Sequence, residues 1–164
     1  MVAGGMATVV VVAMIVTAWT WPILNEVETG ATPEYPELQP HYYSTEPARI
    51  HEEAKAAVEE LQRWEVVDAD PASLRVDAER TTRLGFVDDI TIRAEPVTEF
   101  VSRVHVRSAS RVGQADLGQN ARNINEFFDE LQQRLGAVQF DPAQADVEDD
   151  EAQPDSSEDV TGEG

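Results

Sequence analysis

The sequence predicts an α+β fold: a two-layer sandwich in which an antiparallel four-stranded sheet carries two helices on one face, preceded by one transmembrane helix. Two segments with helical spacing of apolar residues enclose several short segments in which apolar and polar residues alternate. At 164 residues, the chain has room for one domain of about 100 residues with appendages. The expected parts are a transmembrane anchor (1–24), a Pro-rich tether (25–40), the α+β domain (41–140) and a disordered acidic tail (141–164).

Residues 1–24 contain no charged side chain and have a strongly apolar centre, which suits one membrane span of roughly 20 residues. Trp19 and Trp21 near the end are typical of an interfacial aromatic belt, and Pro22 then ends the helix. A cleaved signal peptide is the alternative, but no Lys or Arg precedes the apolar run and no small-x-small site follows it. We therefore expect a single-pass protein of the cell membrane. The acidic residues directly after the span favour an extracytoplasmic domain.

The two flanks of the domain lack hydrophobic periodicity. The stretch NEVETGATPEYPELQP has three prolines and is interpreted as an extended tether. Residues 141–164 carry ten acidic residues and no basic one, and their few apolar side chains cannot offset the entropy of ordering them. Residues 41–140 hold eighteen acidic and twelve basic residues, a net charge of −6. Half of the chain's net charge of −20 therefore belongs to the tail.

The composition excludes several classes of function. Every basic residue except Lys55 is an arginine, and an acidic excess with almost no lysine is typical of halophilic proteins, although an ordinary acidic protein is the alternative. Nucleic acid is not expected as a partner, because a phosphate backbone needs a basic face. The chain has no cysteine, which excludes disulfides, thiolate metal sites and cysteine nucleophiles.

The domain begins with an amphipathic helix and continues with strands. Pro47 suits the first turn of a helix that ends near Trp64. Its apolar residues recur at helical spacing: Ile50, Ala54, Ala57, Val58 and Leu61. A short strand and a turn follow in WEVVDADPAS, and alternation then predicts half-buried antiparallel strands in LRVDAE, FVDDITIRAE and VSRVHVRSAS.

A second helix closes the domain, running from about Leu117 to Leu135, with Gly136 suited to its cap. The segment GQADLGQN before it is expected to form a turn. Gly113 and Gly118 allow backbone conformations that other residues resist, and Asp116 is available as the helix N-cap.

A row of cations marks the last predicted strand. Because strand side chains alternate, Arg103, His105, Arg107 and, if the strand continues, Arg111 share the face away from the helices. One allowed hairpin register sets Asp89 opposite Arg107, Thr91 opposite His105 and Asp88 opposite Ser108; a shift by two residues sets Asp89 opposite His105. The row is either a solvated face of ion pairs, individually worth about 0 to 1 kcal/mol, or a docking surface for carboxylates, phosphates or an acidic partner.

Asp88 shares its face with apolar residues, where an unpaired carboxylate is costly. Ser108, Ser110 and Asn120 are the candidates to satisfy it. A structural polar cluster and part of an active or ligand site are both open interpretations.

Signatures of catalysis are few. The three histidines have no partners at metal-ligand spacing, and no phosphate-binding or dinucleotide motif occurs. We expect no catalytic residue, no metal site and no cofactor.

The segments TRLGFVDDITIRAEP and VHVRSASRVGQADLGQNARNI, with TPEYPELQP and WEVVDADP before them, resemble the domain of unknown function 1499 family. The resemblance covers roughly residues 32–135, and implies membrane attachment or export without assigning a reaction. The motif positions are Phe86, Asp88, Asp89, Arg107, Ser108, Ser110, Arg111, Gly113, Asp116, Gly118 and Asn120. Many members carry a Pro-Asn-Cys segment before the domain, which this sequence lacks.

The expected function is a membrane-anchored, non-enzymatic module that presents the arginine row to an anionic small molecule or an acidic protein. The alternatives are a hydrolase-like enzyme that uses Asp88, Asp89 and Arg107, and a purely structural envelope or assembly factor.

Overall fold

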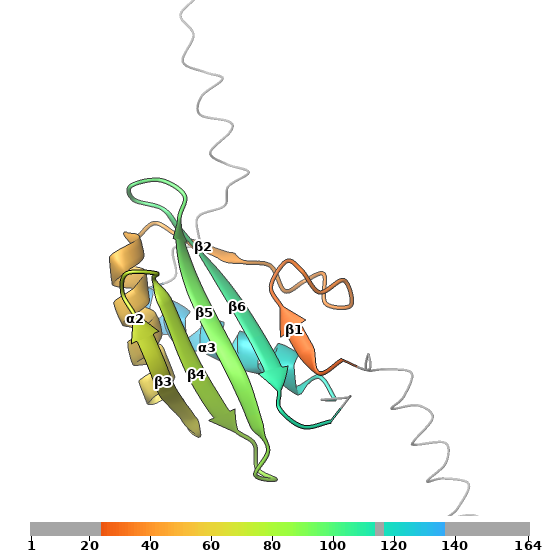
Figure 1. Ribbon diagram of the computed structural model, residues 1–164. Coiled ribbons are helices and arrows are strands. Elements are labelled where there is room, and N and C mark those ends of the chain that lie inside the picture. Colours follow the sequence, from red (N-terminus) through yellow and green to blue (C-terminus); the bar gives the residue numbers. More distant parts are fainter. Residues whose placement is uncertain (1–23, 114–116, 137–164) are drawn as a thin grey trace, which may run out of the picture.

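The computed structural model describes residues 24–113 and 117–136. In these parts the chain forms an antiparallel sheet, and two helices cover one of its faces (Figure 1). The elements in chain order are β1 (Glu26–Glu28), β2 (His41–Tyr43), α2 (Pro47–Glu60), β3 (Trp64–Asp70), β4 (Arg75–Thr81), β5 (Val87–Pro96), β6 (Ser102–Ser110) and α3 (Gln119–Leu135). The predicted α+β class, with an antiparallel sheet and two helices, is confirmed.

The core lies between the inner face of the sheet and the two helices. Alternation in the strands buries every second side chain, as in Ile90 and Ile92 of β5 and Val104 and Val106 of β6. The helices contribute a stripe at helical spacing: Ile50, Ala54, Ala57, Val58, Ile124, Phe127, Phe128 and Leu131. The pattern that predicts these elements is therefore also the pattern that packs them.

The prediction of four strands is wrong, because the described sheet has six, in the order β1-β6-β5-β4-β3, with β2 also paired to β6. β1 pairs with residues 107–109 and β2 with residues 102–104, so the two short strands lie one after the other along the same edge of β6. Val27 and Tyr43 point into the core from them. Part of the segment expected to be a tether thus lies in the sheet. Strands of three residues are too short to show alternation, which is why the sequence pattern misses them.

The hairpin of β5 and β6 has a different register from both predicted ones. Thr91, and not Asp89, lies opposite Arg107, while Asp88 lies opposite Ser110. The strands pair as far as Pro96 and Ser102, and the turn is closed by a hydrogen bond from the Val97 amide to the Val101 carbonyl. The shift is two residues from the first predicted register and four from the second, so each side chain keeps its predicted face.

The helix boundaries also differ from expectation at two points. α2 ends at Glu60, before Trp64, which begins β3. α3 begins at Gln119, directly after Gly118, whose φ of 75° lies in the left-handed region that favours glycine.

None of the helices in the described residues is long and apolar enough to cross a membrane. The anchor predicted for residues 1–24 lies outside the described residues except for Leu24, and the predicted acidic tail lies entirely outside them.

Candidate functional site

The arginine row lies on the outer face of the sheet, and its members form ion pairs with carboxylates of the same chain. Arg103 donates to Glu95 at 2.7 Å, and Arg107 donates from Nε to Glu26 at 2.7 Å and from a second nitrogen to the other carboxylate oxygen. Arg111, one residue past β6, donates to Asp89 at 2.7 Å and also to Glu79. His105 lies 3.5 Å from Glu95.

These pairs change the proton affinity of the groups involved. The hydrogen bonds from Arg107 hold the pKa of Glu26 below its ordinary value, and those from Arg103 do the same for Glu95. In return, the carboxylates of Asp89 and Glu79 raise the pKa of Arg111. The row is therefore a set of charged, mutually neutralised groups.

Asp88 lies on the opposite, inner face and is 1% exposed. Its two carboxylate oxygens accept hydrogen bonds from the Ser110 hydroxyl at 2.7 Å and from the Asn123 amide at 2.9 Å. It forms no ion pair within the described part of the chain. Within the described residues, the hydrogen bonds of this buried carboxylate therefore come from neutral donors.

The contacts of Asp88 belong to a larger buried polar cluster, which joins β5, β6, α3 and the residue before β1. Ser108 donates to the Asn120 side-chain oxygen at 2.6 Å and accepts from Asn123 at 3.0 Å. Asn120 donates to the carbonyl oxygen of Asn25 at 2.9 Å and to Ser110 at 3.3 Å. Every member thus has partners, as buried polar groups require.

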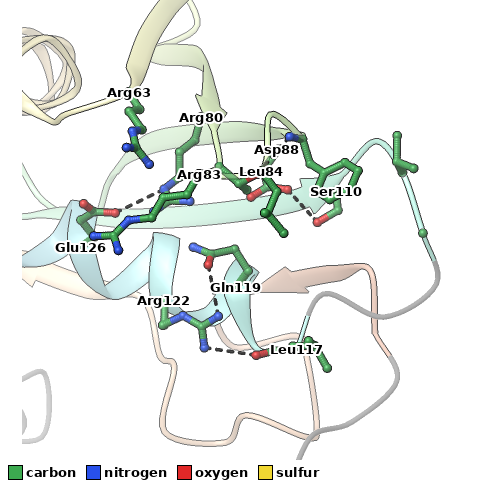
Figure 2. Close-up of a pocket in the computed structure, with 14 residues that line it drawn as sticks. Arg63, Arg80, Arg83, Leu84, Asp88, Ser110, Leu117, Gln119, Arg122 and Glu126 are labelled. Atoms are coloured by element: carbon green, nitrogen blue, oxygen red, sulfur yellow. Dashed lines mark hydrogen bonds and ion pairs between the residues drawn. The ribbon is translucent and has the colours of Figure 1, made fainter.

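Above this cluster the structure has a cavity of about 770 Å³ between the β4–β5 turn, the start of α3 and the residue before β3 (Figure 2). Asp88 and Ser110 lie at its floor. The rest of its lining combines arginines and apolar side chains with three other polar residues: Arg63, Arg80, Thr82, Arg83, Leu84, Phe86, Val112, Gly113, Leu117, Gln119, Arg122 and Glu126.

The lining is positively charged in an acidic protein, since four arginines stand against Asp88 and Glu126. Arg80 lies 3.4 Å from Glu126, and Arg122 donates to the Leu117 carbonyl and to the side chain of Gln119. The guanidinium groups of Arg63 and Arg83 form no hydrogen bond or ion pair with other described residues. Within the described residues, these two cations at the cavity therefore have no competing carboxylate.

The structure brings together only some of the residues singled out from the sequence. Asp88, Ser108, Ser110 and Asn120 meet in the buried cluster, and Gly113 lines the cavity. Gly118 precedes α3, whereas Asp116 lies outside the described residues.

The residues proposed for a hydrolase-like site do not meet. Asp88 is on the inner face, while Asp89 and Arg107 are on the outer face in separate ion pairs. No group of three or more His, Asp or Glu side chains with metal-binding geometry occurs among the residues that the structure describes.

Sequence reasoning missed Asn123 and the arginines of the cavity. Asn123 follows Asn120 by three positions and precedes buried Ile124, so its place on the inner face of the helix was a usable signal. Arg63, Arg80, Arg83 and Arg122 come from three separate segments of the sequence, with Arg80 and Arg83 in the same one, and no regular spacing joins them.

The family model described as "Protein of unknown function (DUF1499)" matches residues 19–131, more than half of the chain. The chain belongs to this family. Six of the motif positions through which the sequence resembles DUF1499 lie together in the fold: Phe86, Asp88, Ser110 and Gly113 line the cavity, and Ser108 and Asn120 support its floor. Asp89, Arg107 and Arg111 lie on the outer face instead.

Two solved structures are similar in part. One is the di-domain ARO/CYC BexL from the BE-7585A biosynthetic pathway, with a TM-score of 0.44 and 15% identity over 67% of this chain and 46% of that one. The chain thus spans less than half the length of BexL. The other is TTHA0849 from Thermus thermophilus, with a TM-score of 0.41 and 17% identity over 67% of this chain and 96% of that one. No curated protein matches the sequence.

Proposed function

We propose that this DUF1499 domain is a non-enzymatic module that binds an organic anion with an apolar body in the cavity above Asp88. The observation that carries the proposal is the lining itself, which combines apolar walls with the guanidinium groups of Arg63 and Arg83, for which the described residues offer no partner. A volume of about 770 Å³ also falls within the roughly 300 to 1,000 Å³ of small-molecule sites.

The cations define the polar end of the ligand. Guanidinium groups fork onto carboxylates or phosphates, and Arg63 and Arg83 have no competing partner among the described residues. Asp88 lies at the floor and, among the described residues, contacts only neutral donors, so a second carboxylate or a phosphate at the floor would meet a like group. The anionic group is therefore expected beside the arginines and away from the floor.

The apolar walls define the rest of the ligand. Leu84, Phe86, Val112 and Leu117 line the cavity and are exposed, so a bound hydrocarbon or aromatic group would remove part of their surface from water. A purely polar anion such as free phosphate would leave this surface exposed. The lining therefore fits an amphipathic anion better.

A matched pair of probes tests the proposal. Naphthalene-2-carboxylate and naphthalene-2-carboxamide share an apolar body and differ in charge. We expect the full chain, reconstituted in phosphatidylcholine nanodiscs, to bind the carboxylate more tightly in calorimetric titrations. Arg83→Gln should weaken carboxylate binding about tenfold, since it removes one charged hydrogen bond, and should leave carboxamide binding unchanged.

Arg103→Gln is the control, because Arg103 is already paired with Glu95 on the outer face. Equal affinity of the unmodified protein for the two probes would contradict the proposal, as would an equal loss in the two variants.

We also propose that the domain is held at the cell membrane, outside the cytoplasm, by residues 1–24, and that it works at high salt. The uncharged N-terminal stretch and the net charge of −20 support these two points. A melting temperature that does not rise between low and molar salt would argue against the second, because salt screens the self-repulsion of an acidic chain.

A further inference from the structure

The rim of the cavity is formed by four exposed apolar side chains. Leu84 and Phe86 in the β4–β5 turn are 83% and 49% exposed, and Val112 and Leu117 between β6 and α3 are 63% and 59% exposed. They make up four of the seven large exposed apolar residues in the described part of the chain. Such a concentration at one end of a domain indicates an interaction surface.

The chain enters the domain beside this rim. The carbonyl oxygen of Asn25 accepts hydrogen bonds from the Ser110 amide at 2.8 Å and from the Asn120 side chain at 2.9 Å, and Ser110 lines the cavity. In Figure 1 the start of β1, the β4–β5 turn and the end of β6 lie toward the same end of the sheet, with the β5–β6 turn at the other end.

Covalent geometry then limits how far this end can lie from a membrane. The sequence predicts a span that ends with Trp21 at the bilayer interface. Four residue steps separate Trp21 from Asn25, and a fully extended chain covers roughly 14 Å in four steps. If residues 1–24 span the bilayer, the rim of the cavity is held at its surface.

Charge favours the same orientation. An anionic bilayer repels the chain as a whole, since the net charge is −20, but the cavity lining carries an excess of arginines. Arg63 and Arg83 are free of partners among the described residues, and basic side chains near a bilayer are attracted to anionic headgroups. The cavity end is therefore the part of the domain best suited to face such lipids.

We propose that the rim of the cavity docks on the surface of an anionic lipid bilayer, with Leu84, Phe86, Val112 and Leu117 in the interface and Arg63 and Arg83 beside the lipid phosphates. The inference concerns how the domain sits on the membrane, and it does not depend on a ligand occupying the cavity. In this placement the cavity opens toward the bilayer.

Single-cysteine labelling tests this placement directly, because the chain contains no cysteine. Leu84→Cys and Leu117→Cys place a nitrobenzoxadiazole label on the rim. Phe100→Cys places it on the β5–β6 turn, where Phe100 is also exposed, at 62%. The full chain is reconstituted in vesicles of phosphatidylcholine and phosphatidylglycerol, with or without brominated acyl chains, which quench the label on contact.

We expect brominated lipid to reduce the fluorescence of the labels at positions 84 and 117 and to leave the label at position 100 unchanged. Adding Arg83→Gln to Leu117→Cys should reduce the quenching in vesicles that contain phosphatidylglycerol and should have no effect in pure phosphatidylcholine. Circular dichroism of each variant checks that it is folded.

Three results would overturn the placement. They are equal quenching at positions 84 and 100, no quenching at either rim position, and self-quenching that grows with the protein-to-lipid ratio in vesicles without bromine. The last would show that a second copy of the chain covers the rim. Binding of naphthalene-2-carboxylate is measured separately, so failure of this inference is distinguishable from failure of the proposed function.

Discussion

Two sets of arginines, one on the outer face of the sheet and one in the connections beside the cavity, have different surroundings. On the outer face, Arg103, Arg107 and Arg111 each bind at least one carboxylate of the same chain. At the cavity on the other side, Arg63 and Arg83 have no such partner among the described residues. The arginines that are regular in the sequence are therefore neutralised in the fold, while Arg63 and Arg83, which no regular spacing joins, have no partner in the part of the chain that the structure describes.

The difference shows what a regular spacing of arginines in the sequence indicates. Residues at every second position of a strand share a face, so a cation row is met by an anion row on the neighbouring strands. A cavity is assembled from turns and helix ends, which come from distant places in the chain. Function in this domain is better sought where unrelated segments converge.

The largest effect is expected at the floor of the cavity. Asn123→Ala removes the donor to Asp88 Oδ2 and a donor to Ser108, leaving a buried carboxylate with one side-chain partner fewer. We expect a loss of about 3 kcal/mol in the free energy of unfolding, the upper range for an unsatisfied buried group. Urea unfolding of the full chain in detergent measures it.

Asn125→Ala on the exposed side of the same helix is the control and should have little effect. Equal losses in the two variants would show that the stability of the floor does not depend on the Asn123 hydrogen bonds.

Substitutions in the two sets of arginines should also differ in their effect on the stability of the protein. Arg107→Gln breaks the two-pronged contact with Glu26, and its cost should be at most about 1 kcal/mol, because the pair is partly exposed and screened by water. Arg83→Gln should leave the free energy of unfolding unchanged. The same unfolding measurement in molar salt should shrink the Arg107→Gln effect. If Arg83→Gln proved the more destabilising of the two, the contrast between paired and unpaired arginines would fail.

The smallest expected effect is a dependence of stability on pH, which arises from an ion pair on the outer face. Because Arg107 lowers the pKa of Glu26 below its ordinary value of 4.5, the pair stabilises the fold above that pH. This contribution is lost as the pH falls through the lowered pKa. The difference in unfolding free energy between the unmodified protein and Glu26→Gln, about 0.5 kcal/mol or less, should therefore disappear in strong acid.

Glu34→Gln is the control, since Glu34 is exposed and forms no ion pair within the described residues. A difference for Glu26→Gln that persists unchanged at low pH would mean that the charge of Glu26 does not stabilise the fold.

Much of the fold follows from alternation and helical spacing. These patterns assign Asp88 to the inner face and Asp89 to the outer face, and the structure agrees. They do not determine the register, because a shift of two residues preserves every face, and the Val97–Val101 turn decides among the allowed registers. β1 and β2 are too short to carry a periodic signal, and their pairing depends on the open edge of β6.

The candidate site was predictable only in part. Ser110 could be assigned to Asp88 because both belong to neighbouring strands and share a face. The cavity depends on how the β4–β5 turn packs against the start of α3. Packing between distant segments is not encoded in a local sequence pattern. Arg63 illustrates the point: its φ of 69° lies in the left-handed region, at a sharp connection between α2 and β3.

The pairing of β1 with β6 also sets an order of events during synthesis. Glu26 meets Arg107 across 81 residues of sequence, and the Asn25 carbonyl meets Asn120 across 95. At about 5 to 20 residues per second, a ribosome needs roughly 4 to 16 seconds to supply β6 after β1 has been made. The first strand of the domain must therefore wait for one of the last elements, and during that interval its hydrogen-bonding groups are open to chaperones or to neighbouring chains.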